Sequence, residues 1–436
     1  MGTTSTEFQV SEVQFKLDGW GYWEDRIEDL AARVRAKVSW IPIVTDRGGK
    51  AFGLSFAQAL ADGVFWVPPW ISVLPGETHQ EKWLRTHPYV IVRSNAMNED
   101  WEDSRAGLHE SKGVYSFDHA QKFITELLAG CGGVVLQHRV DHGVGVVVDL
   151  GWSELLHRNV LRVAIGCPSQ QGGGVVYTSP TWDHEAGIGV FDASTGEAIV
   201  DLKAHYFDVK RIVDKMVTMI VPRLMNWGIT FGLQFEFVGN LHEDNDALVQ
   251  VRPSPGDLRG QFVNAPTEGQ LLVTTGKVNR PGEARGETIF VDGPNDRRRP
   301  RQLYTMLSHV GQRDIDGYEF SDDGLSPEFT GRIVVWNYDA LQRYGASLSQ
   351  VLGAWKVGAI AQVASRAVFI NSAHGTSIPL WRKQSREIAA FDRAKSGGPM
   401  LAIGHEESRA LVRACHATPI TLHVVSDGLV GQIYQL

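Results

Sequence analysis

Residues 233–252 read LQFEFVGNLHEDNDALVQVR, and the rest of the chain is interpreted outward from this pattern. Two largely apolar runs, 233–238 and 248–252, flank a polar loop, which predicts a β-hairpin. The first run contains one charged residue, Glu236. Because burying an unpaired carboxylate is costly, Glu236 is expected to have a metal ion or a cationic side chain as its partner.

The second arm of the hairpin carries two further polar residues. Gln250 is an even number of positions from Glu236, so the two side chains can share one face, and Arg252 points to the same side as Gln250. Binding a nucleoside triphosphate with its metal requires hard oxygen ligands for the metal and cations on the phosphate oxygens. The hairpin offers both.

Two segments nearer the N-terminus add further parts of such a site. Residues 46–54 form a glycine-rich turn, in which two glycines supply flexible backbone donors just before Lys50. The β-type run 89–94 places Arg93 near its end, where it could reach an anion. Taken alone, Gly-Gly-Lys is usually a turn with a solvated lysine, so these signals count only in combination.

The remaining pattern predicts an α+β or α/β multidomain protein. Short apolar runs over 132–202 predict strands, and an apolar stripe over 209–225 predicts a long helix. The Pro-Ser-Pro-Gly segment at 253–256 is a natural boundary. Residues 256–330 are rich in Gly, Pro, Arg and Asp, and 420–431 predict a strand, a turn and a last strand.

Composition excludes several classes of protein. A chain of 436 residues with 43% hydrophobic and 21% charged residues suggests a soluble globular protein of two or three domains. A net charge of −8 gives no field that would attract nucleic acid or a membrane, and the basic run 297–301 is interpreted as a solvated or phosphate-facing loop. Three distant cysteines and the lack of a signal-like or membrane-spanning segment favour a cytoplasmic protein.

Taken in order, five blocks resemble one family, which comprises phosphoenolpyruvate synthase, pyruvate phosphate dikinase and the rifampin phosphotransferases. The blocks are 46–69 (GGK…VPP), 92–100 (VRSNAMNED against the family's VRSSATAED), 136–148 (LQHRV…GVGVV against VQ-x-MV…SGV), Glu236 (the glutamate of DIE-[WF]) and 249–253 (VQVRP against LQ-[AV]-RP). The resemblance implies an ATP-grasp nucleotide-binding domain over 40–255. Before it, apolar residues at helix spacing predict a helical extension over 1–39.

The same resemblance implies roles for single residues. Lys50 and Arg93 would bind the nucleotide phosphates, and Arg252 would stabilise charge on the phosphoryl group during transfer. Gln137 would lie near the adenine. Such cations matter because phosphoryl transfer needs placement and charge neutralisation more than covalent chemistry.

By the same resemblance, Glu236 and Gln250 would hold magnesium, so ATP and Mg²⁺ are the expected cofactors.

The sequence also departs from the family in two places. The family's segment after its VRSSATAED block is shortened, so that 116–129 leads almost directly to the strand of Gln137. Residues 166–174 replace the family's GLGE-like loop with a different glycine-rich sequence.

A second, looser set of blocks resembles the swivelling phosphohistidine domain of this family. Residues 276–286 resemble the opening of that domain, 398–404 its GIPAVVG strand and 425–433 its closing VDG motif. Between them, 372–377 (SAHGTS) resemble the segment with the phosphorylated histidine, which implies His374 as the catalytic nucleophile.

A neutral imidazole is a competent phosphoryl acceptor, and the glycine after His374 leaves room for the phosphate. The alternatives are a structural or surface histidine at this position, or His416 in a sequence that mimics the same motif. The composition of 256–330 predicts a linker and the start of a second domain, and the resemblance implies a small swivelling β/α domain over 331–436.

The chain is therefore expected to be an ATP-dependent, dikinase-type phosphotransferase. Phosphate would pass through His374 to a small-molecule acceptor, with AMP and phosphate as the other products. No segment corresponds to the family's pyruvate-binding barrel, so a dedicated small-molecule kinase is favoured. Two alternatives stay open: an ATP-grasp ligase that activates a carboxylate as an acyl phosphate without a phosphohistidine, and a non-catalytic nucleotide sensor.

Overall fold

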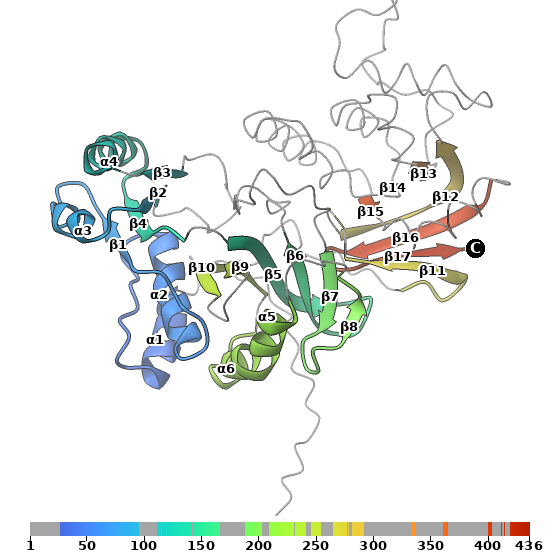
Figure 1. Cartoon of the computed structure of the whole chain (residues 1–436). Coiled ribbons are helices and arrows are strands. Elements are labelled where there is room, and N and C mark those ends of the chain that lie inside the picture. Colours follow the sequence, from blue (N-terminus) through green and yellow to red (C-terminus); the bar gives the residue numbers. More distant parts are fainter. Residues whose placement is uncertain are drawn as a thin grey trace, which may run out of the picture.

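The computed structural model shows helices and three β-sheets in an α+β arrangement (Figure 1). It describes residues 27–95, 111–114, 116–140, 143–165, 188–202, 209–230, 232–240, 246–253, 265–276, 278, 281–291, 333–336, 361–364, 400–402, 411, 414 and 419–436. Within these ranges, none of the helices combines the length and apolar character needed to cross a membrane. The predicted domain boundaries stay predictions.

A six-stranded antiparallel sheet has the strand order β10-β9-β5-β6-β7-β8. The strands are β5 (Gly143–Ser153), β6 (Arg158–Ile165), β7 (Ile188–Asp192), β8 (Ala198–Val200), β9 (Leu233–Asn240) and β10 (Ala247–Pro253). The predicted hairpin is confirmed as β9 and β10. Because β5 pairs with β9, residues from distant parts of the sequence become neighbours on this sheet.

The hairpin contains one extra residue. Leu248 lies opposite Phe237, but the register then shifts so that Gln250, and not residue 249, lies opposite Glu236. Such a β-bulge leaves the extra residue outside the regular ladder. The bulge is what allows Leu248 to face the core while Gln250 shares a face with Glu236, as predicted.

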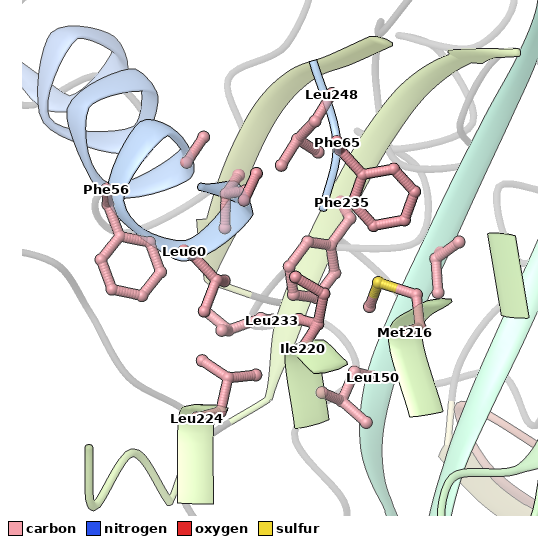
Figure 2. Close-up of a cluster of buried hydrophobic side chains, with 14 of the residues drawn as sticks. Phe56, Leu60, Phe65, Leu150, Met216, Ile220, Leu224, Leu233, Phe235 and Leu248 are labelled. Carbon is pink, nitrogen blue, oxygen red and sulfur yellow. The ribbon is translucent and has the colours of Figure 1, made fainter. Parts of the chain in front are cut away.

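One face of this sheet is covered by helices (Figure 1). The predicted helix over 209–225 is confirmed as α5 (Lys210–Lys215), a π-helical turn (Met216–Ile220) and α6 (Val221–Asn226) in direct succession. Figure 2 shows how side chains from this segment, from α2 and from the strands interlock beneath the sheet. The buried side chains of the predicted stripe are Ile212, Met216, Ile220 and Leu224.

Helix α2 (Gly49–Ala61) packs against β10 and is joined by α1 (Ile27–Lys37). The helix approaches so closely that a Cβ at Gly53 would lie 2.3 Å from the carbonyl oxygen of Val251. Gly48, which precedes the helix, has a φ of 99°, a conformation that favours glycine. Both glycines are therefore required by backbone geometry at this contact.

A smaller antiparallel sheet has the order β1-β4-β2-β3. Its elements are β1 (Trp70–Val73), β2 (Val90–Ser94), β3 (Ser111–Val114) and β4 (Val134–His138), with α3 (Gln80–Thr86) and α4 (Phe117–Cys131) packed on it. Helix α4 begins after Ser116, whose hydroxyl accepts from the backbone N–H of His119, and ends at Gly132 in the left-handed conformation.

The third sheet contains seven strands in the order β11-β17-β16-β12-β13-β14-β15. They are β11 (Gln270–Thr275), β12 (Pro281–Val291), β13 (Ile333–Trp336), β14 (Ala361–Ala364), β15 (Met400–Ala402), β16 (Thr421–Asp427) and β17 (Gly431–Gln435). The first four in spatial order pair antiparallel and the rest parallel. The predicted strand, turn and strand near the C-terminus are confirmed as β16 and β17.

The turn between β16 and β17 packs on the six-stranded sheet. Leu429 and Val430 are completely buried in a cluster with Val160 and Val190. Beside them, Asp427 accepts a hydrogen bond of 2.5 Å from the hydroxyl of Ser153. Burial raises the pKa of the Asp427 carboxyl.

Candidate functional site

The polar face of the hairpin brings three of the predicted residues together. Glu236 and Gln250 lie directly opposite each other, and Arg252 lies two residues further along β10. The guanidinium Nη2 of Arg252 is 3.1 Å from Oε1 of Glu236, and each of the three residues is at most 3% exposed. The partner expected for the buried carboxylate is therefore present, and it is a cation of the same hairpin.

Two further predicted residues reach this face from the smaller sheet. Arg93 on β2 donates through Nη1 to Oε1 of Gln137 on β4 at 3.2 Å, and through Nη2 to Oε1 of Gln250. Gln137 in turn donates to the carbonyl of Val249 at 3.1 Å. Val249 is the extra residue of the β-bulge, so its carbonyl is available to a group outside the ladder. The site is thus built from both sheets.

Lys50 completes the predicted set, but in a different element from the one expected. It lies in the first turn of α2 and not at the end of a loop, because the helix begins at Gly49. The side chain is largely buried and its Nζ donates to the hydroxyl of Ser94 at 3.4 Å. Since Ser94 follows Arg93 on β2, Lys50 and Arg93 belong to the same part of the molecule.

The segment before Lys50 is fixed by an ion pair that sequence reasoning missed. Arg47 donates from both guanidinium ends to Glu77, at 2.7 and 2.9 Å. The backbone N–H of Leu74 donates to the same carboxylate at 2.8 Å. The hydrogen bonds from Arg47, against the effect of desolvation, lower the pKa of Glu77 to about 2.

The donor set fits ATP with magnesium. A carboxylate of Glu236 and an amide oxygen of Gln250 on adjacent strands are the hard oxygen ligands that magnesium prefers, and magnesium usually takes only one or two protein carboxylates together with nucleotide phosphates. Among the residues that the structure describes, no cluster of three or more His, Cys, Asp or Glu side chains could hold a metal by itself. Arg93 and Arg252 beside these oxygens are suited to phosphate groups.

A second set of polar residues on the same face was not predicted. They are Gln234 of the hairpin strand β9, Asp149 of β5 and Arg162 of β6, and all three are buried. The signal that singled out Glu236, a charged residue inside an apolar strand run, also applies to Asp149 and Arg162. Their connection to the hairpin could not be inferred, because it depends on the order of strands in the sheet.

The predicted nucleophile His374 and the block 372–377 lie outside the described residues, as does the glycine-rich loop 166–174. The phosphohistidine relay therefore stays a prediction from sequence.

Known proteins provide a distant likeness. No protein-family model and no curated protein matches the chain. Among solved structures, a D-alanine–D-alanine ligase from Bacillus anthracis is 10% identical with a TM-score of 0.27, covering 48% of this chain and 60% of that chain. An N5-carboxyaminoimidazole ribonucleotide synthetase from Thermus thermophilus is 12% identical with a TM-score of 0.27, covering 46% and 43% of the two chains.

The ATP-grasp ligase PsnB is 13% identical with a TM-score of 0.25, covering 51% of this chain and 54% of that one. The chain thus spans about half the length of these solved structures. A likeness of this size says nothing about the reaction. Each of the three matches covers about half of this chain.

Proposed function

We propose that this chain is an ATP-dependent enzyme of the ATP-grasp type, which transfers a phosphoryl group from magnesium-bound ATP to a small-molecule acceptor. One observation supports it above all. Hydrogen bonds join Arg93 and Gln137 of one sheet to Gln250 and the carbonyl of Val249 on the other, where Glu236 and Arg252 form a buried ion pair. Their guanidinium groups and side-chain oxygens are the cations and hard oxygen donors that a metal–triphosphate complex requires.

The roles proposed for single residues are those that the family resemblance implies, and the charges of the residues agree with them. Lys50 and Arg93 would bind phosphate oxygens, and Arg252 would stabilise the charge on the phosphoryl group in transfer. Glu236 and Gln250 would hold the magnesium ion, which when bound neutralises phosphate charge. In the present arrangement these oxygens face guanidinium groups, so nucleotide phosphates would compete for the same cations.

More specifically, we propose that the phosphoryl group is relayed through His374, as in a dikinase. The imidazole of His374 would attack the β-phosphorus of ATP and release AMP, and water would then remove the γ-phosphate as inorganic phosphate. The remaining phosphoryl group would pass from the histidine to the acceptor. The sequence blocks at 372–377, 398–404 and 425–433 support this form.

The alternative is an ATP-grasp ligase. It would transfer the γ-phosphoryl group to a substrate carboxylate, release ADP and need no histidine. A sensor would bind ATP without turnover.

Labelled ATP separates these forms. The full chain is incubated with magnesium and ATP labelled at either the β- or the γ-phosphorus, and nucleotides, phosphate and protein-bound label are measured. We expect AMP, phosphate and acid-labile β-label on the protein, with the label absent from His374→Asn. Label that persists in this variant would exclude His374, and ADP formed on addition of carboxylate substrates would establish the ligase. A chain that does not bind magnesium–ATP in calorimetry would overturn the proposal as a whole.

A further inference from the structure

A row of buried polar side chains crosses the six-stranded sheet and ends at the candidate site. It takes one residue from each of four neighbouring strands: Arg252 (β10), Gln234 (β9), Asp149 (β5) and Arg162 (β6). The strand register places each of them directly opposite the next. None of the four is more than 6% exposed.

The row is continuous in hydrogen bonds. Nε of Arg252 donates to Oε1 of Gln234 at 2.7 Å, and Nε2 of Gln234 donates to Oδ1 of Asp149 at 2.6 Å. The other oxygen of Asp149 accepts from Nη1 of Arg162 at 2.8 Å. Nε of Arg162 donates to the backbone carbonyl of Gly276, at the end of β11, at 2.6 Å. The far end of the row is thus anchored on the main chain.

The charge of Asp149 determines which group donates and which accepts in each hydrogen bond of the row. A carboxylate can only accept hydrogen bonds, so Gln234 must present its amide NH₂ group to Asp149 and therefore its carbonyl oxygen to Arg252. Arg162 pairs with the buried carboxylate of Asp149 at 2.8 Å, so the charge of Asp149 has a partner on the next strand. With the reverse amide orientation, two donors would face each other at Arg252, which is costly where water cannot enter.

We propose that Asp149 is a positioning residue, which acts through Gln234 to aim the guanidinium of Arg252 at the transferred phosphoryl group; this rests on the function proposed above. Arg252 is held at two points, at Nε by Gln234 and at Nη2 by Glu236. These two contacts leave the guanidinium plane little freedom to turn. Loss of the row would release one of the two holds without removing the charge.

The test uses Gln234→Met, which removes both central hydrogen bonds while keeping the length of the side chain and adding no charge. We expect the rate of product formation from labelled ATP to fall roughly tenfold to a hundredfold, because a small misplacement of a catalytic group is enough for that. The Kd for magnesium–ATP should change less than the rate. Asp149→Asn should have the same effect.

A reciprocal swap then distinguishes positioning from mere stability. The double variant Asp149→Asn with Gln234→Glu keeps every hydrogen bond of the row and its net charge, since the amide and the carboxylate exchange places. We expect it to recover most of the rate that the single variants lose. A control is Asp246→Asn, which breaks the buried ion pair with Arg211 near the opposite end of β10 and should lower stability without changing the rate.

Failure of the positioning role and failure of the proposed function give different results. If Gln234→Met folds and turns over ATP at the wild-type rate, the positioning role is wrong, whatever the variant does to stability. The role is equally wrong if the folded double variant stays as slow as the single ones. If wild-type protein itself shows no turnover of magnesium–ATP, the function proposed above fails, and the positioning role fails with it.

Discussion

Strand β9 uses consecutive residues for two different purposes. Phe235 and Phe237 face the helices and are completely buried, whereas Gln234 and Glu236 face the opposite side and meet charged partners. Exposure does not separate the two faces, because Gln234 and Glu236 are only 2% and 3% exposed. The faces differ in chemistry alone.

The difference shows how one sheet can carry stability and function side by side. On the apolar face, each ring stabilises the fold because it is removed from water and packs closely. Neither effect depends on a single partner. On the polar face, desolvation costs free energy that only correctly placed partners offset. These side chains therefore define one arrangement of the site and add little net stability. Substitutions on the two faces should therefore affect different measurements.

The largest expected effect tests the polar face. Glu236→Gln keeps the size of the side chain and an oxygen for Arg252 but removes the charge proposed to bind magnesium. We expect magnesium–ATP turnover per folded molecule to fall roughly a hundredfold to a thousandfold. The free energy of unfolding should also fall, because Arg252 loses its buried counter-charge. Turnover measured over a range of magnesium concentrations checks this, and wild-type turnover would show that the metal is held elsewhere.

Phe235→Ala makes the matching change on the apolar face. Removal of the ring leaves a cavity beneath the sheet, which should lower the free energy of unfolding by about 3–5 kcal/mol. Denaturant titration measures the loss, and turnover per folded molecule should stay within about twofold of wild type, since the polar face is untouched. Phe235→Leu serves as the milder variant if the alanine protein does not fold. A lost activity in folded protein would mean that the faces are not independent.

The smallest effect concerns an ion pair away from both faces. The pKa of Glu77 is about 2 in the folded chain against an ordinary value of 4.5, so its ionised form stabilises the fold above pH 4.5. That contribution is lost as the pH falls from 4.5 toward 2. The difference in unfolding free energy between wild type and Glu77→Gln should therefore shrink over this window. A difference that does not change with pH would assign the effect to packing.

Much of this division could be read from the sequence, because alternation in a strand is a local property. The pattern of 233–238 predicted the strand, and Glu236 was expected to have a metal ion or a cationic side chain as its partner. The choice of Arg252 as that partner could not be predicted, nor could the link to Asp149, because both depend on which strands lie side by side. The helical position of Lys50 was missed because glycines before a lysine resemble a loop, although they here precede and begin a helix.

Deletion of Val249 would leave the hairpin in register, because Leu248 and Gln250 would then pair with consecutive residues of β9. The faces of every other side chain in β10 would stay as they are. What would disappear is the carbonyl that accepts from Gln137, and with it one of the ties between the smaller sheet and the larger one. A residue that the strand register does not need therefore supplies one of the hydrogen bonds that join the two sheets.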